Sequence, residues 1–191
     1  MKRYSFMDYN EYFETQVTTN RKKANNRGTG FSWVKPKELD LVAVHIRENT
    51  RLPHTGICHG VRTGAEVRYL RQTLSPDVIG TDLVAHEFKD VVIHDMNVVN
   101  SDWVNSVDFV YSNSFDHAFD PYLTFNRWMD QLRDGGKCYI HWGPGYANIN
   151  RPNCTGGTKR DLERFVDDLG YVVYDIIETG FEERFVLVSQ H

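Results

Sequence analysis

Four stretches of this sequence combine residue types that could bind a ligand, and each follows directly after a short apolar run. They are a turn with two glycines at residues 60–64, single aspartates at positions 82 and 95, and a polar loop at residues 112–117. Glycines let a backbone approach a ligand closely, and amides at the start of a helix favour an anionic group. A carboxylate can accept hydrogen bonds from both hydroxyls of a ribose. In this order, these residues favour a ligand that contains a nucleoside.

Seven apolar runs supply the strands that would position these residues. The runs cover residues 56–58, 78–80, 91–93, 107–111, 137–141, 172–177 and 184–188, and helices are predicted over residues 65–74, 122–132 and 159–169. Continuous apolar strands that alternate with helices indicate a parallel sheet covered on both faces. Only residues 178–183 join the last two runs, which is too short a connection for parallel strands. The sequence therefore predicts an α/β fold with a doubly wound, mostly parallel seven-stranded sheet and a C-terminal antiparallel hairpin.

The first part of the chain differs from this pattern. Tyr9, Tyr12 and Phe13 recur at helical spacing and predict a helix over residues 8–24, and a second amphipathic helix is predicted over residues 37–48. We therefore divide the chain into an N-terminal helical arm, residues 1–36, and a domain, residues 37–191. We expect residues 4–24 to close as a lid over the ligand about a hinge at residues 25–30. A helix packed permanently on the flank of the domain is the alternative.

In order along the chain, the strand-end residues resemble those of the class I S-adenosylmethionine-dependent methyltransferases, which have a Rossmann-like fold. The resemblance covers residues 38–189, and it includes the closing hairpin and a turn at residues 132–137 similar to the family's L-x-x-G-G turn. It implies a methyltransferase that binds S-adenosylmethionine and releases S-adenosylhomocysteine. It also implies the residues that bind this cofactor: His59, Gly60, Arg62, Gly64, Asp82, Leu83, Asp95, Met96 and Asn113. Asp82 would hold the ribose, Asp95 and Met96 the adenine, and Asn113 would lie beside the methyl group.

Two departures from the family pattern keep other functions open. The acid that usually precedes the first glycine is replaced by Cys58 or His59, and residues 83–90 leave room for at most one helical turn. A non-catalytic relative that serves as a nucleoside-binding or scaffold module is therefore the alternative function. A nucleotide-binding oxidoreductase is a third hypothesis, against which the absence of a G-x-G-x-x-G motif and the terminal hairpin count.

Three residues near the predicted strand ends are candidates for proton transfer. We expect His117, Asp116 and His141 to be catalytic, because imidazole titrates near neutral pH and these residues lie at the predicted reaction edge. A structural hydrogen-bonding role is the alternative for His117. The acceptor would lie over residues 112–117, bounded by His141 and Trp142. The eight histidines show neither an H-x-x-x-H nor, with the cysteines, a C-x-x-C spacing, so we predict no metal site.

Composition narrows the classes of partner. The chain has 191 residues, with 22 basic and 26 acidic side chains and a formal net charge of −4, which argues against a nucleic-acid partner held by bulk charge. No apolar run reaches the roughly 18 residues of a membrane helix, and three cysteines are an odd count that is typical of reduced thiols. We therefore expect a cytoplasmic protein that acts on a small-molecule acceptor.

Overall fold

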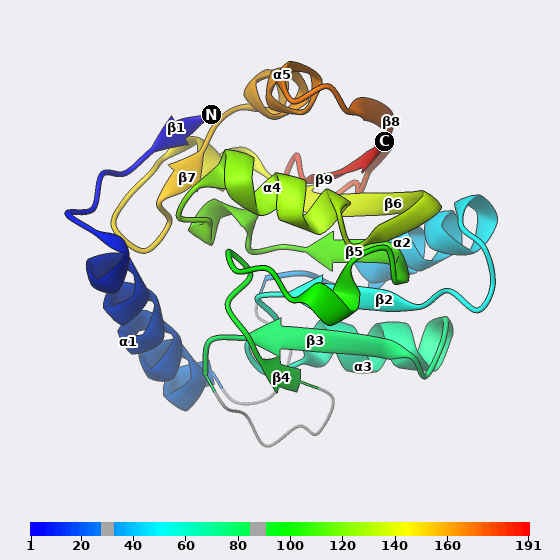
Figure 1. The fold of residues 1–191 in the computed structure, drawn as a ribbon, viewed down its shortest axis with the longest axis horizontal. Coiled ribbons are helices and arrows are strands. Elements are labelled where there is room, and N and C mark those ends of the chain that lie inside the picture. The colour runs from blue at the N-terminus through cyan, green and yellow to red at the C-terminus, as the bar shows by residue number, and fades with distance from the viewer. Residues whose placement is uncertain (28–32, 85–90) are drawn as a thin grey trace.

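The computed structural model describes residues 1–27, 33–84 and 91–191, and it gives residues 24–27 as helical backbone only. Within these residues, seven strands form one sheet in the order β4-β3-β2-β5-β6-β9-β8 (Figure 1). The strands are β2 (Gly56–His59), β3 (Val78–Asp82), β4 (Val91–Ile93), β5 (Val107–Ser112), β6 (Leu132–Trp142), β8 (Val172–Glu178) and β9 (Phe185–Gln190). The strands from β4 to β6 run parallel, whereas β9 is antiparallel to both β6 and β8. The predicted fold, including its C-terminal hairpin, is confirmed.

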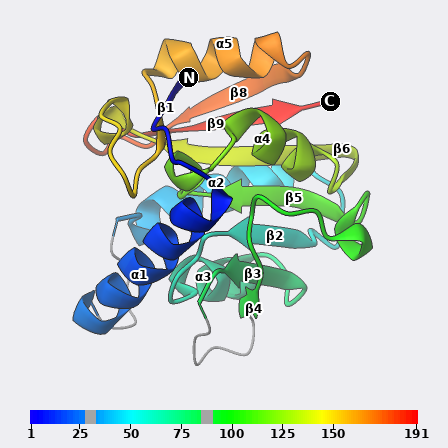
Figure 2. The ribbon, with the colours of Figure 1, turned by 60° about the vertical axis from the view of Figure 1, so that its left-hand side comes forward.

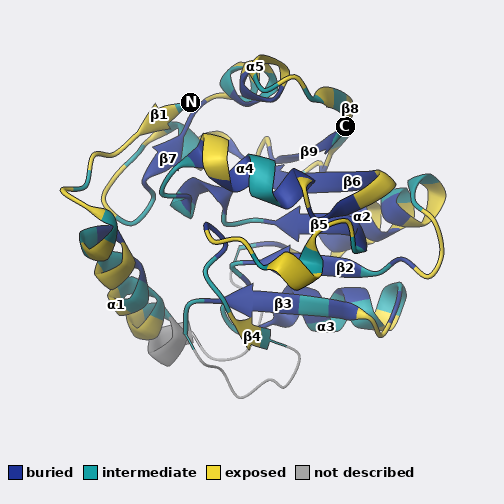
Figure 3. Cartoon of the chain, viewed as in Figure 1, coloured by how far each residue is buried: buried dark blue, intermediate teal, exposed yellow. Residues whose placement is uncertain are grey.

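Helices cover both faces of this sheet (Figure 2). α2 (Pro36–Asn49) and α3 (Ala65–Thr73) pack on one face, and α4 (Pro121–Met129) and α5 (Lys159–Asp168) pack on the other. Because successive side chains of a strand point to opposite faces, Cys58 of β2 joins the first core and Ile57 joins the second. Figure 3 shows the buried central strands between helices that expose their outer sides. None of the helices in the described part of the chain is long and apolar enough to cross a membrane.

Several helices begin where the sequence supplies a cap. Asp120 accepts hydrogen bonds from two backbone N–H groups of the first turn of α4, and Thr158 and Asp161 form a capping box at α5. Pro36 occupies the first turn of α2, where Glu38 accepts a hydrogen bond from the preceding backbone. These contacts satisfy N–H groups that a helix start leaves without a partner. The starts of these helices are therefore fixed by local sequence.

The start of β6 differs from the prediction. α4 ends at Met129 rather than at residue 132, and Leu132 already belongs to β6, where it pairs with Val107 of β5. Gly135 has a φ of 80°, a conformation that favours glycine. The turn expected at residues 132–137 is therefore the irregular first part of a strand, and the helix predicted as far as residue 132 was too long.

The N-terminal segment lies along the carboxyl edge of the sheet. α1 (Tyr9–Arg27) follows Asp8, whose side chain accepts a hydrogen bond from the N–H of Glu11, and Figure 1 shows α1 beside the edge at which β3 and β5 end. β1 (Lys2–Arg3) pairs antiparallel with β7 (Thr155–Gly156), a contact between distant segments that no local pattern indicates.

The helix predicted over residues 8–24 is thus confirmed, and it extends through residues 25–27 of the expected hinge. Residues 28–30 of the hinge, and residues 85–90 of the connection expected to be short, lie outside the described part of the chain. The division into an arm (residues 1–36) and a domain (residues 37–191) stays a prediction.

The packing of β2 on β5 gives a first test of the core. A Cβ atom at Gly56 would lie 2.2 Å from Cζ of the buried Phe109 ring. We expect Gly56→Ala to lower the free energy of unfolding by about 1–3 kcal/mol, because the ring must shift to admit the methyl group. Urea unfolding measures this change. Gly145→Ala is the control, since nothing lies within 4 Å of a Cβ there; similar losses at both positions would contradict this packing.

Candidate functional site

A cavity lies beyond the carboxyl ends of β2, β3, β4 and β5. The chain passes from β2 outward to β3 and β4, and then returns to β5 on the other side of β2, so the strand order reverses at this edge. This is the place where doubly wound sheets bind ligands. Seven residues expected from the sequence line the cavity: Gly60, Arg62, Asp82, Leu83, Asp95, Met96 and His117.

One face of α1 closes the cavity. Five of its lining residues come from this helix: Tyr12, Gln16, Thr19, Asn20 and Lys23. Their spacing of three or four residues places them on one face of a helix, and that spacing is the signal in the sequence that could have identified them. Sequence reasoning found the helix, with Tyr12 on its aromatic face, and the loop that contains Ser114, but it missed Gln16, Thr19, Asn20, Lys23 and His94 as residues that line the cavity.

Asp82 ends β3 with its carboxylate aimed at neighbouring donors. The residue is 3% exposed. Its Oδ2 accepts a hydrogen bond from the backbone N–H of Arg62 at 2.6 Å, and its Oδ1 accepts one from Nδ2 of Asn20 at 2.5 Å. The N–H of Val84 lies 3.2 Å from the same Oδ1. The glycine turn, the end of β3 and α1 therefore meet at one carboxylate.

Asp95 is held in the same way. Its Oδ1 accepts hydrogen bonds from the backbone N–H and from Nδ2 of Asn97, at 2.8 and 2.7 Å. Its Oδ2 accepts a hydrogen bond from the hydroxyl of Tyr9 on α1. Burial, together with the hydrogen bond and charge of Asp95, raises the pKa of Tyr9, so this hydroxyl stays a donor. Both predicted cofactor-binding carboxylates thus contact α1.

The turn after β2 requires a glycine at its first position. Gly60 has a φ of 70°, and a Cβ atom there would lie 2.6 Å from Cβ of Ser114. The N–H groups of Gly60 and Val61 both bond the carbonyl oxygen of Thr81, which ties the turn to β3. Gly64 also has a φ of 70°, but it caps the start of α3 and does not line the cavity.

A smaller polar pocket adjoins the cavity at Gly60, Arg62 and Ser114, and it brings Asn113 to the site. Nδ2 of Asn113 donates to Oε1 of Glu66 at 3.0 Å, which fixes the orientation of the amide because a carboxylate oxygen only accepts. Burial raises the pKa of Glu66 despite this bond. Sequence reasoning missed Glu66, which lies two residues after Gly64 in the first turn of α3.

His59 was expected to bind cofactor, but its side chain lies inside the core. Its Nδ1 is 2.8 Å from Oγ1 of Thr81, its Nε2 is 3.0 Å from Oε1 of Gln131, and its ring stacks on Trp128 of α4. His59 follows Cys58, so its side chain points to the face that α4 covers. Only its backbone borders the turn. Burial lowers the pKa of His59 to about 3.

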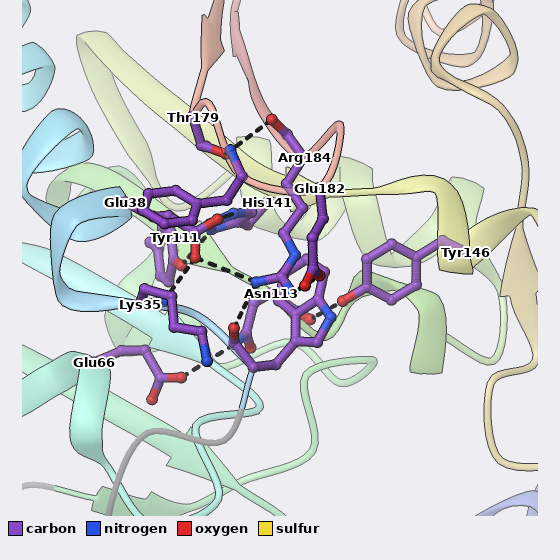
Figure 4. Close-up of polar contacts among 12 residues, drawn as sticks. Lys35, Glu38, Glu66, Tyr111, Asn113, His141, Tyr146, Thr179, Glu182 and Arg184 are labelled. Carbon is purple, nitrogen blue, oxygen red and sulfur yellow. Dashed lines mark hydrogen bonds and ion pairs between the residues drawn. The ribbon is translucent and has the colours of Figure 1, made fainter.

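His141 is also buried, in a polar cluster on the opposite face (Figure 4). Its Nε2 is 3.2 Å from Oε1 of Glu38, its Nδ1 is 3.0 Å from the hydroxyl of Tyr111, and Nη1 of Arg184 donates to the second oxygen of Glu38 at 3.3 Å. Burial lowers the pKa of His141. Burial alone would raise the pKa of Glu38, but its hydrogen bonds and the charge of Arg184 hold it below the usual value.

This cluster ties α2 to β5 and β6, and it leaves His141 with both ring nitrogens engaged. The neighbouring Trp142 is likewise buried, and its Nε1 donates to the carbonyl oxygen of Gly157. Neither side chain lines the cavity or the adjoining pocket. His117 lines the cavity, whereas Asp116 lies buried behind it. The described residues include no group of three or more side chains that could hold a metal ion.

No protein-family model and no curated protein matches this sequence. Solved structures do match. A 1,6-didemethyltoxoflavin-N1-methyltransferase from Burkholderia thailandensis, with bound 1,6-didemethyltoxoflavin and S-adenosylhomocysteine, matches at a TM-score of 0.73 and 12% identity, over 97% of this chain and 91% of that one. A magnesium protoporphyrin IX methyltransferase from Synechocystis PCC 6803 with bound S-adenosylmethionine matches at 0.66 and 12% identity, over 97% and 99%.

A [4+2]-cyclase also matches, at a TM-score of 0.61 and 10% identity, over 78% of this chain and 79% of that one. At such low sequence identities, the similarity to these structures shows the fold alone. The chain has the fold of the class I S-adenosylmethionine-dependent methyltransferases, as the order of its strand-end residues predicts.

The buried position of His59 predicts a particular response to acid. Its folded-state pKa of about 3 lies below the unfolded value of about 6.5. The unfolded chain therefore binds more protons, and stability falls as pH falls through this window. In His59→Gln, the slope of unfolding free energy against pH between about pH 4 and 6 should decrease by about 1.4 kcal/mol per unit. Urea unfolding across this range gives the slope, and an unchanged slope would contradict a neutral buried histidine.

Proposed function

We propose that this protein is an S-adenosylmethionine-dependent methyltransferase that acts on a small-molecule acceptor. The observation that carries the proposal is the convergence of Asp82, Asp95 and the Gly60 turn on one cavity at the strand-order reversal. Each feature alone has a structural explanation. Together they place two carboxylates and a close backbone approach where a nucleoside can be held at its sugar and its base.

The residues present fit the cofactor. Asp82, Asp95 and Gly60 line one cavity. The two carboxylates there can accept hydrogen bonds from the sugar and the base of a nucleoside, and Gly60 packs closely against Ser114, where a Cβ atom would lie 2.6 Å from Cβ of that residue. Asp82 would hold the ribose, Asp95 with the backbone at Met96 the adenine, and the turn from Gly60 with Asn113 the methionine portion. When bound, the cofactor supplies a methyl group activated by a positively charged sulfur.

The chain's own residues would position the reactants and keep water out of the cavity. Glu66 fixes the Asn113 amide, and Oδ1 of Asn113 accepts a hydrogen bond from the hydroxyl of Ser114 at 3.1 Å. Side chains held rigidly in this way reduce the entropy that is lost when cofactor and acceptor align for the reaction. The face of α1 that lines the cavity would exclude water from it.

Two observations favour the alternative of a non-catalytic nucleoside-binding module. The donors Tyr9 and Asn20 already satisfy oxygens of the two carboxylates. The match to a [4+2]-cyclase means that this fold also occurs in a protein with a different activity. Calorimetry with S-adenosylmethionine, S-adenosylhomocysteine, NAD and NADP separates the hypotheses. Binding of the first two, with methyl transfer to an acceptor, supports the proposal; binding without turnover over a broad acceptor panel supports the module; preference for NAD or NADP indicates an oxidoreductase.

We expect both carboxylates to contribute to cofactor affinity without being needed for folding. Asp82→Ala should weaken binding of S-adenosylhomocysteine by about 1.5–3 kcal/mol, the range for a lost hydrogen-bond partner that carries charge, and Asp95→Asn should weaken it while leaving the fold intact. Isothermal titration calorimetry and circular dichroism measure the two effects. Asp175→Ala is the control, because Asp175 lies half-exposed on β8 at the other edge of the sheet. Unchanged affinity in either site variant would remove that residue from the site.

We further expect α1 to act as a lid. Asn20→Ala removes the amide that bonds Asp82, so S-adenosylhomocysteine should dissociate about tenfold faster, the effect of one lost charged hydrogen bond. Stopped-flow measurement with a chasing excess of cofactor gives the rate. Glu14→Ala, on the exposed side of α1, should leave it unchanged. Tighter binding in Asn20→Ala would mean instead that α1 competes with the ligand for Asp82.

A further inference from the structure

Two side chains at the end of β5 face each other across a gap without a hydrogen bond. Oδ1 of Asp116 lies 3.9 Å from Nε2 of His117, within the short helical turn η2 (Phe115–His117). Asp116 is 2% exposed, and its Oδ1 has no hydrogen-bond partner among the described residues. Burying a carboxylate oxygen without a donor costs stability, and such atoms are rare in folded proteins. The described residues supply no donor to this oxygen, and a bound molecule would.

The protonation of the His117 ring follows from its other contact. The carbonyl oxygen of Pro152 lies 2.6 Å from Nδ1 of His117, and it also accepts a hydrogen bond from Nε2 of Gln16 at 2.8 Å. A carbonyl oxygen only accepts, so Nδ1 must carry a proton. In the neutral ring Nε2 then presents a lone pair. Both atoms that flank the 3.9 Å gap are therefore hydrogen-bond acceptors.

The width of the gap selects the kind of donor. For a donor atom placed about 2.9 Å from both acceptors, the separation of the acceptors sets the acceptor–donor–acceptor angle at about 85°. A nitrogen with two N–H bonds can donate to both acceptors from that point, as a water molecule can, whereas the hydroxyl of an alcohol or phenol has one proton to give. The charges of Lys23 and Arg62 also act on Asp116, and two nearby cations favour a neutral amine over an ammonium ion. Tyr146 and Cys154 also sense the charge of Asp116.

We propose, resting on the methyltransferase function proposed above, that Asp116 Oδ1 and His117 Nε2 bind the –NH₂ group of a primary-amine acceptor. The amine nitrogen forms the new N–C bond as the C–S bond breaks, and the electron pair of that bond stays on sulfur. One N–H proton passes to Nε2 of His117. The resulting imidazolium then faces the carboxylate of Asp116 as an ion pair, so the charge formed in the step is neutralised where it arises.

The test uses aniline as the probe, because it is a neutral primary amine, with phenol as a single-donor analogue and N,N-dimethylaniline as one without donors. Each is titrated into full-length protein saturated with S-adenosylhomocysteine, and the ¹⁵N resonances of His117 are followed by NMR. We expect Nδ1 to carry a proton in the unliganded protein. Of the three compounds, only aniline should shift the ¹⁵N resonance of Nε2, and it should bind more tightly than N,N-dimethylaniline. A protonated Nε2 with a bare Nδ1, no binding of aniline, or displacement of aniline by S-adenosylhomocysteine would overturn the proposal.

Asp116→Asn supplies the matched variant. It should weaken aniline binding about tenfold, the effect of losing an acceptor that carries charge, and leave the affinity for S-adenosylhomocysteine unchanged. Asp120→Asn, which keeps a good helix cap four residues further on, should change neither. If Asp116→Asn folds poorly, His117→Gln tests the same site, because its amide can still donate to Pro152. Equal aniline affinity in the variants and the parent protein would refute the assignment.

Stability gives an independent readout. Burial raises the pKa of Asp116 despite the favourable charges of Lys23 and Arg62, so the ionised carboxylate weakens the fold above the unfolded-state pKa of about 3.9. Asp116→Asn should therefore raise the melting temperature by about 2–4 °C at neutral pH, and this gain should vanish below about pH 4. A lower melting temperature at neutral pH would indicate a structural role instead and overturn the proposal.

Failure of the proposed function is distinguishable from failure of this inference. If the parent protein binds neither S-adenosylmethionine nor S-adenosylhomocysteine in calorimetry, the methyltransferase proposal falls. Aniline titrated into the protein without cofactor then still reports on the site: binding that depends on Asp116 supports an amine site, and binding indifferent to Asp116 rejects it.

Discussion

The need of buried carboxylates for hydrogen-bond donors organises this molecule. Asp82 is buried at the end of β3, Asp95 is partly buried after the adjacent parallel strand β4, and their oxygens would be costly to enclose without partners. Backbone N–H groups of the neighbouring turns and the amide of Asn97 supply some donors, and side chains of α1 supply others. A helix far away in the sequence is therefore attached to the sheet by the same oxygens that the proposed ligand would use. Whatever changes the partners of these oxygens must also change how α1 is held.

The molecule keeps buried charge at its carboxyl edge, where an apolar core would be more stable. The carboxylate of Glu38 is stabilised by Arg184 and His141, and this buried ion pair fixes one arrangement of the chain. Glu66 and Asp116 differ, because burial raises the pKa of each without full compensation. Stability lost in this way is typical of functional sites. The first cluster holds α2 in place, whereas Glu66 lines the pocket that adjoins the cavity and Asp116 lies beside His117, which lines the cavity itself.

The fold could be predicted from the sequence because its signals are local. Apolar runs of strand length, the short connection at residues 178–183 and the caps at Asp120 and Thr158 each act over a few residues. The same is true of the lining residues that directly follow a strand, such as Asp82 and Asp95. The sequence failed where the outcome depends on a partner elsewhere in the chain. His59 and His141 end their strands on faces that α4 and α2 happen to cover, and nothing beside them in the sequence indicates that cover.

A single backbone oxygen connects α1 to the segment after β5, a contact that no local sequence pattern predicts. The carbonyl of Pro152 accepts hydrogen bonds from Gln16 on α1 and from His117 after β5, and both side chains line the cavity. The hydroxyl of Tyr12 donates to the carbonyl oxygen of His117 itself, which adds a second link between α1 and this residue. Movement of α1 away from the cavity would remove a donor from Pro152 and another from His117. It would also admit water to the lone pair of Nε2. The position of α1 therefore governs the surroundings of His117, and in the proposed mechanism closure of the arm and preparation of the base would be one physical event.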